Sequence, residues 1–230
     1  MHRAGQGVFR HLKAVYPYAH NILVLVGTGN NAGDGYVVAT LAKSFGWHVT
    51  LGALNPAKPL TGDAFTAQQS WLADGGEIRP WQELDFQHFD VIVDGILGTG
   101  LKGTVRDDAA ALIKTVNGID LPVLSIDVPS GLDADTGAPL GVCVYADCTV
   151  TLVAKKLGML TGQGKIYCGK LIFDDLDIAQ AFNTLTQPCA FLVNYAQLPA
   201  LRKRQSNAHK GHFGRLLTVG ANADMPGSLR

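Results

Sequence analysis

Short, continuously apolar segments alternate with segments of helical character along most of the chain, and this alternation limits the possible folds more than any other feature. Strands that are buried on both faces have such uninterrupted apolar sequences, because helices cover each side of a parallel sheet. The pattern therefore predicts an α/β fold with a mostly parallel sheet covered on both faces. The predicted strands are residues 22–26, 48–54, 91–94, 123–127, 148–153 and 170–173, and the predicted helices are residues 1–17, 35–45, 61–74, 107–117 and 175–183.

Polar residues and glycines gather where three of these strands end. GTGNNAGDG (27–35) follows the first predicted strand, DGILGTG (94–100) contains the end of the third, and DVPSGLD (127–133) contains the end of the fourth. In open parallel sheets, ligands bind at the carboxyl ends of the strands. Three glycine-containing segments with an Asp or Asn at a strand end therefore predict one binding site at one edge of the sheet.

The first of these segments combines features that a simple phosphate loop does not need. Its glycines allow a sharp turn and a close approach to a ligand, and the amides that open the next helix form an anion site. Asn30, Asn31 and Asp34 add side-chain oxygens. Because a carboxylate repels phosphate, we expect Asp34 to serve a sugar hydroxyl, a cation or the loop itself.

Two common nucleotide-binding motifs fit this segment poorly. Residues 27–32 match the G-x-G-x-x-A dinucleotide pattern, but residues 47–57 contain no Asp or Glu for the ribose, which argues against an ordinary dehydrogenase. No Lys-Ser/Thr pair follows the loop, as a P-loop requires.

Asp94 and Asp127 each end an apolar run, where an Asp either caps a helix or acts as a general acid or base. Their equivalent positions beside glycine-containing loops favour a functional role. Asn31, Asp94 and the region of Ser130 offer hard oxygen ligands, which suit an alkali or alkaline-earth cation better than zinc.

Composition restricts the partners and the compartment. The 19 basic and 19 acidic residues balance, so nothing in the charge favours a nucleic-acid partner. No apolar run approaches the length of a membrane span, and the four cysteines lack metal-type spacing. Cys143 and Cys148, which lie in an apolar run, are predicted to be buried thiols. These features predict a soluble protein of a reducing compartment, the cytoplasm. Lys155 and Lys156 either meet a phosphate or form a solvated strand end.

Four segments in order carry a resemblance to a known family: VGTGNNAGDGYVVATLA, DVIVDGILGTGLKGTV, LSIDVPSGLDADTG and ADCTVTLVAKKLGMLTGQG. Together, over residues 3–180, they resemble the NAD(P)H-hydrate epimerase family, the YjeF N-terminal domain. The resemblance implies a three-layer αβα, Rossmann-like domain. It also implies an isomerase that interconverts the R and S forms of hydrated NADH and NADPH, as a homo-oligomer.

The resemblance also implies a role for individual residues. Asp127 is the expected catalytic residue, and we give it the general acid/base role. Asn31, Asp94 and Ser130 are expected to hold one potassium ion per subunit, which orders the loops. The expected substrate-binding residues are Asn30, Asn31, Ala32, Gly33, Asp34, Gly98, Thr99, Gly100, Leu101, Lys102, Gly103, Thr104 and Asp127.

Both ends of the chain suggest a longer protein. Residues 1–197 are assigned to the epimerase domain, with its N-terminal lead-in missing, and residues 198–207 to a linker. Residues 208–230, with an apolar strand at 215–219, are similar to the start of the ADP- or ATP-dependent NAD(P)H-hydrate dehydratase domain. The resemblance thus implies a bifunctional repair enzyme whose lyase part, and its ADP or ATP site, is truncated here.

A non-enzymatic scaffold is the alternative, since relatives of this fold occur in mRNA decapping assemblies. Retention of Asn31, Asp94, Asp127 and Ser130 together favours the enzyme.

Overall fold

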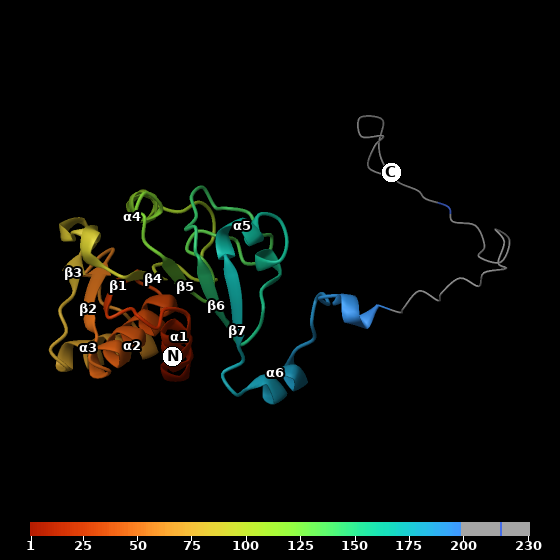
Figure 1. The fold of residues 1–230 in the computed structure, drawn as a ribbon, viewed down its shortest axis with the longest axis horizontal. Helices are drawn as coiled ribbons and strands as arrows, with labels where there is room; N and C mark the ends of the chain where they lie inside the picture. Colours follow the sequence, from red (N-terminus) through yellow and green to blue (C-terminus); the bar gives the residue numbers. More distant parts are fainter. Residues whose placement is uncertain (199–216, 218–230) are drawn as a thin grey trace. The chain divides into compact units, whose positions relative to one another are not determined.

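A seven-stranded sheet in the order β3-β2-β1-β4-β5-β6-β7 organises residues Met1–Pro188, and every strand pairing is parallel (Figure 1). The computed structural model describes residues 1–198 and residue 217. The predicted α/β class with a mostly parallel sheet is confirmed. The strands are β1 (Asn21–Val26), β2 (His48–Ala53), β3 (Arg79–Pro80), β4 (Val91–Gly95), β5 (Val123–Ile126), β6 (Cys148–Leu152) and β7 (Lys170–Asp174).

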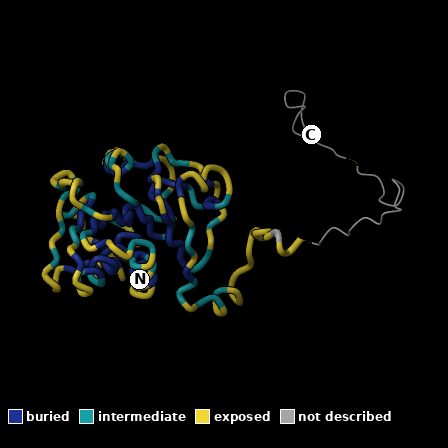
Figure 2. The backbone as a smooth tube through the Cα atoms, in the orientation of Figure 1, coloured by how far each residue is buried: buried dark blue, intermediate teal, exposed yellow. Residues whose placement is uncertain are grey.

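Helices cover both faces of the sheet and make three layers. Helices α1 (His2–Val15), α2 (Asn30–Ser44) and α3 (Gly62–Ala73) lie on one face, and α4 (Asp107–Asn117) lies on the other (Figure 1). Because side chains alternate along a strand, Ile22, Val24 and Val26 of β1 pack with the first group, whereas Leu23 and Leu25 pack with α4. The central strands are accordingly the most deeply buried part of the chain (Figure 2).

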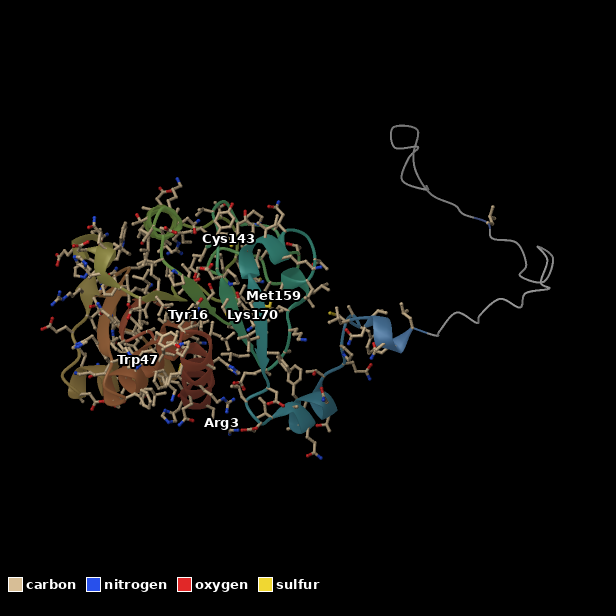
Figure 3. All side chains as sticks on the ribbon, in the orientation of Figure 1. Arg3, Tyr16, Trp47, Cys143, Met159 and Lys170 are labelled. Atoms are coloured by element: carbon tan, nitrogen blue, oxygen red, sulfur yellow. The ribbon has the colours of Figure 1, made fainter. Side chains whose placement is uncertain are left out.

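A third apolar cluster packs beyond β5 and contains Cys143 and Met159, which Figure 3 labels. Cys143 and Cys148 are buried and free, as predicted. Cys168 is also buried and free, whereas Cys189 is free but exposed. The remaining elements are short. They are α5 (Gly164–Cys168), α6 (Ala179–Leu185) and the 3₁₀ turns Trp81–Glu83, Phe86–His88, Leu157–Met159 and Tyr195–Gln197.

The predicted strand boundaries agree with the structure to within one residue, but two of the predicted helices begin at the wrong residue. The helix predicted over 35–45 begins at Asn30, so Gly33 and Gly35 are helical residues and do not form the turn. A Cβ atom on Gly33 would lie 2.8 Å from the Ala64 Cα atom of α3, and one on Gly35 would lie 2.8 Å from Val26 Cγ1 of β1. These glycines therefore let α2 pack closely against its neighbours.

Other differences involve short elements. Strand β3 was not predicted, because two residues that include a proline carry no strand pattern. The last predicted helix, 175–183, is displaced to Ala179–Leu185. The compact unit ends at Pro188. Apart from Leu198 and Leu217, the predicted linker 198–207, the segment 208–230 and its strand at 215–219 lie outside the described residues. Among the described helices, none is both long and apolar enough to span a membrane.

Candidate functional site

The three predicted segments meet at one edge of the sheet, because β1, β4 and β5 are adjacent strands. They line a cleft of about 760 Å³. Of the predicted substrate-binding residues, ten line this cleft: Asn30, Asn31, Asp34, Gly98, Thr99, Gly100, Leu101, Lys102, Thr104 and Asp127. Ala32, Gly33 and Gly103 are not among the lining residues, and Ala32 is fully buried within α2.

The segment after β1 brings the start of α2 into the cleft. Gly27 is required where β1 leaves the sheet, since a Cβ atom there would lie 2.0 Å from the carbonyl oxygen of Ile96. Gly29 is the N-cap of α2, and it provides no side-chain cap for the first turn. Because the first amides of a helix lack intrahelical partners, this end of α2 can bind an anion.

A buried carboxylate joins the segments after β4 and β5. Asp94 is fully buried, and its two oxygens accept four hydrogen bonds. The Ile96 amide and the Ser130 hydroxyl donate to Oδ1, while the Ser125 hydroxyl (2.8 Å) and the Ser130 amide (2.9 Å) donate to Oδ2. Burial raises the pKa of Asp94, and the hydrogen bonds oppose this effect. Asp94 therefore connects two of the loops that form the cleft.

The expected cation ligands lie around the same carboxylate. The Ser130 hydroxyl lies 3.2 Å from the Leu97 carbonyl oxygen, which accepts a hydrogen bond of 2.9 Å from the Asn31 side-chain amide. Hydrogen bonds thus join Asn31, Leu97, Ser130 and Asp94 in one chain. The oxygens are carbonyl, hydroxyl and carboxylate oxygens, a donor set that suits a hard cation. Within residues 1–198 and residue 217, no group of three His, Cys, Asp or Glu side chains is placed to hold a metal ion.

Asp127 directly follows β5 and lines the cleft in a conformation unusual for a non-glycine residue, with φ of 65°. Its Oδ1 atom accepts hydrogen bonds from the Leu152 amide (3.0 Å) and from the Lys156 ammonium group. Oδ2 accepts no hydrogen bond from the described residues. Lys156 also donates to the Leu152 carbonyl (2.9 Å) and to Thr151 (3.1 Å). The pair therefore fixes one carboxylate oxygen and leaves the other available.

This ion pair contradicts one of the two alternatives for Lys156, the solvated strand end. The side chains of Lys156 and Asp127 are each only 19% exposed, so Lys156 is not a solvated strand end. Lys155 instead lies over the ring of Phe173, with Nζ 5.7 Å from the ring centre. The sequence shows neither contact, since 29 residues separate Asp127 from Lys156.

Asp34 is a second carboxyl group of the cleft. Its Oδ1 atom is buried and has no hydrogen-bond partner among the described residues. Burial raises the pKa of Asp34 to about 7, and the charge of Asp127 also raises it. Asp34 can therefore carry a proton near neutral pH, which reduces its repulsion of an anionic ligand.

The structure adds residues that the sequence did not single out. Thr28, Asn55, Lys58, Arg106 and Asp108 also line the cleft. Lys58 and Asn55 follow β2, and the sequence alone does not show that β2 lies next to β1. The cleft thus contains three cationic side chains, those of Lys58, Lys102 and Arg106.

Comparisons with known proteins agree with this architecture. The family model described as YjeF-related protein N-terminus matches residues 1–158. The bifunctional NAD(P)H-hydrate repair enzyme Nnr of Escherichia coli is 40% identical over 231 residues, which cover 100% of this chain and 45% of that protein. The bifunctional NAD(P)H-hydrate repair enzyme of Leishmania infantum is 37% identical over 237 residues, covering 99% and 42%.

The chain thus spans about half the length of these relatives. Among solved structures, yeast ynu0 (YNL200c) superimposes with a TM-score of 0.64 over 83% of this chain and 85% of the yeast chain. At 21% identity this likeness shows the fold alone. The match over residues 1–158 shows that the chain belongs to the family of the YjeF-related protein N-terminus.

Proposed function

We propose that this chain is the epimerase part of a bifunctional NAD(P)H-hydrate repair enzyme and interconverts the R and S forms of hydrated NADH and NADPH. Family membership and the names of the relatives support the reaction. The observation that carries the proposal is the cleft, which brings together Asp127, paired with Lys156, and the N-terminal end of α2, which can bind an anion. The relatives are bifunctional and this chain spans about half of their length, so we assign it the epimerase reaction alone.

The charges of the cleft suit a dinucleotide. Lys58, Lys102 and Arg106 and the free amides at the start of α2 offer positive partners for phosphates. The segment from Gly98 to Thr104 would enclose the diphosphate, and Asn30 to Asp34 would contact the rest of the substrate. Pockets for small ligands have volumes of about 300–1,000 Å³, a range that includes this cleft.

The reaction needs a proton donor and acceptor at one carbon. The hydroxyl group of the hydrated ring sits on a carbon bonded to the ring nitrogen. Protonation of that hydroxyl lets it leave as water while the nitrogen electron pair forms an iminium ion. Water then adds to the opposite face and returns the proton, which inverts the carbon. Asp127, with Oδ1 held by Lys156 and Oδ2 free, would transfer these protons.

We also propose that Asn31, Asp94 and Ser130, with the Leu97 carbonyl, hold one potassium ion. Their neighbouring hard oxygens support this proposal, as does the absence of hydrogen bonds from the described residues to Asn31 Oδ1. A bound cation would stabilise the contact between the loops after β1, β4 and β5. In the cell we expect a cytoplasmic homo-oligomer without nucleic-acid partners.

The test measures interconversion of purified R and S hydrated NADH, resolved by chromatography, above the uncatalysed rate. We expect Asp127→Ala to lower kcat by about 10²–10⁴-fold, the range for removal of a general acid or base. Asp135→Asn, which changes an exposed carboxylate that follows the same segment and lies outside the cleft, is the matched control. Activity of Asp127→Ala within a few-fold of the wild type would overturn the role of Asp127. A wild type without activity would overturn the proposed function.

A further inference from the structure

The loop after β2 forms one end of the cleft, and Asp127 lies at the other end. The strand order β2-β1-β4-β5 places the ends of four strands in a row, and Ala53, Val26 and Gly95 are directly paired at this edge. Adjacent strands lie about 4.8 Å apart, so the ends of β2 and β5 are separated by about 14 Å. Lys58 and Asp127 line the same cleft. The cleft therefore extends across four strands.

This length gives the substrate a direction, a step that rests on the proposed function. A hydrated nicotinamide dinucleotide has its reacting ring at one end, a diphosphate in the middle and an adenosine at the other end. With the ring at Asp127, the diphosphate falls near the β4–α4 segment, which contributes Lys102 and Arg106. The adenosine ribose then falls near the loop after β2.

The charge of that loop determines which ribose it can accept. In dinucleotide-binding α/β domains, an acidic residue after the second strand binds the free ribose 2′-hydroxyl, whereas a basic residue accommodates a 2′-phosphate. Here residues 47–57 contain no Asp or Glu, and the loop contributes Asn55 and Lys58 to the cleft. The carboxyl groups that line the cleft, Asp34, Asp108 and Asp127, come from other elements.

The ammonium group of the exposed Lys58 lies at the cleft, next to one hydroxyl group. Its Nζ atom lies 3.4 Å from the Thr28 hydroxyl, in the loop between β1 and α2. Among the residues that the structure describes, Lys58 forms no ion pair. Its charge is therefore available to a ligand.

We propose that Lys58, assisted by Asn55, binds the ribose 2′-phosphate, so that this chain takes hydrated NADPH in preference to hydrated NADH. The 2′-phosphate is the group that distinguishes the two substrates. The epimerase chemistry at Asp127 is the same for both, so the preference is set at the opposite end of the cleft.

Two measurements test this proposal. Calorimetry compares the binding of adenosine 2′,5′-bisphosphate and of AMP, and steady-state kinetics gives the ratio of kcat/KM for hydrated NADPH to that for hydrated NADH. We expect the wild type to prefer the 2′-phosphorylated partner about tenfold in both measurements, which corresponds to ~1.4 kcal/mol. Lys58→Gln should abolish this preference, whereas Lys58→Arg, which keeps the charge, should retain it. Lys155→Gln, outside the cleft, is the matched control.

Each outcome of these measurements either supports or overturns the 2′-phosphate site. Equal losses for both ligands in Lys58→Gln, or a wild type without preference, would overturn the 2′-phosphate site. Thermal unfolding of each variant shows that it is folded, and a preference kept by Lys58→Arg supports the proposal even if Lys58→Gln misfolds. A Lys58-dependent preference for the bisphosphate without epimerase activity would overturn the proposed function and keep the phosphate site. Epimerase activity without this preference would keep the proposed function and overturn the phosphate site.

Discussion

Ser130 should contribute more to stability than its neighbour Ser125, although both hydroxyls donate to the same buried carboxylate. The Ser125 hydroxyl makes one hydrogen bond, to Asp94 Oδ2 at 2.8 Å. The Ser130 hydroxyl donates to Asp94 Oδ1 and also accepts from the Leu97 amide at 2.8 Å. All three polar side chains are fully buried, so water cannot replace the missing donor.

The magnitudes follow from the bonds that are lost. A hydrogen bond to a charged group contributes about 1.5–3 kcal/mol, and a buried group left unsatisfied costs about 1–3 kcal/mol. Ser125→Ala should therefore lower the free energy of unfolding by about 1.5–3 kcal/mol. Ser130→Ala also leaves the Leu97 amide without its acceptor and should lower it by about 3–5 kcal/mol.

The assay is urea unfolding followed by the fluorescence of Trp47 and Trp71, both buried in the compact unit. The buffer contains choline chloride instead of potassium salts, so that an ion bound to Ser130 does not add to the difference. The midpoint multiplied by a common slope gives the free energy of unfolding for each variant. A loss in Ser130→Ala that is equal to or smaller than the loss in Ser125→Ala would refute this reasoning.

Two further predictions concern titratable groups. Because burial raises the pKa of Asp34 to about 7, the folded chain keeps this proton between about pH 4 and 7 while the unfolded chain loses it. The free energy of unfolding of the wild type, relative to that of Asp34→Asn, should therefore fall by ~2–4 kcal/mol as the pH rises through this range. Urea unfolding at several pH values measures both free energies, and a constant difference between them would contradict the raised pKa of Asp34. Cys189 is exposed, whereas burial raises the pKa of Cys148 and of Cys168 to about 11. Ellman's reagent at pH 8 should therefore titrate one thiol rapidly and the three buried thiols only after denaturation; several fast thiols would show that the cysteines are not buried as described.

The sequence alone determined the layers of the fold and the edge at which the polar residues gather. Strands such as 22–26 are apolar at every position, which indicates burial on both faces of the sheet. This burial can be predicted from the sequence because the hydrophobicity of a residue does not depend on its neighbours. The positions of Asn31, Asp94 and Ser130 at strand ends predicted that they meet, and hydrogen bonds through Leu97 connect them. Local pattern was sufficient to place them at one edge, because the carboxyl ends of all parallel strands lie at the same edge of a sheet.

Other features were decided only by the tertiary structure. The sequence left two roles open for Lys156, a phosphate contact or a solvated strand end. Its contact with Asp127 exists only because β5 and β6 are paired. Lys58 lines the cleft only because β2 lies beside β1. Strand order and side-chain pairing depend on contacts between residues far apart in the chain, and local composition does not encode them. The sequence therefore placed the site at one edge of the sheet, while the strand order determined which charges stand at its two ends.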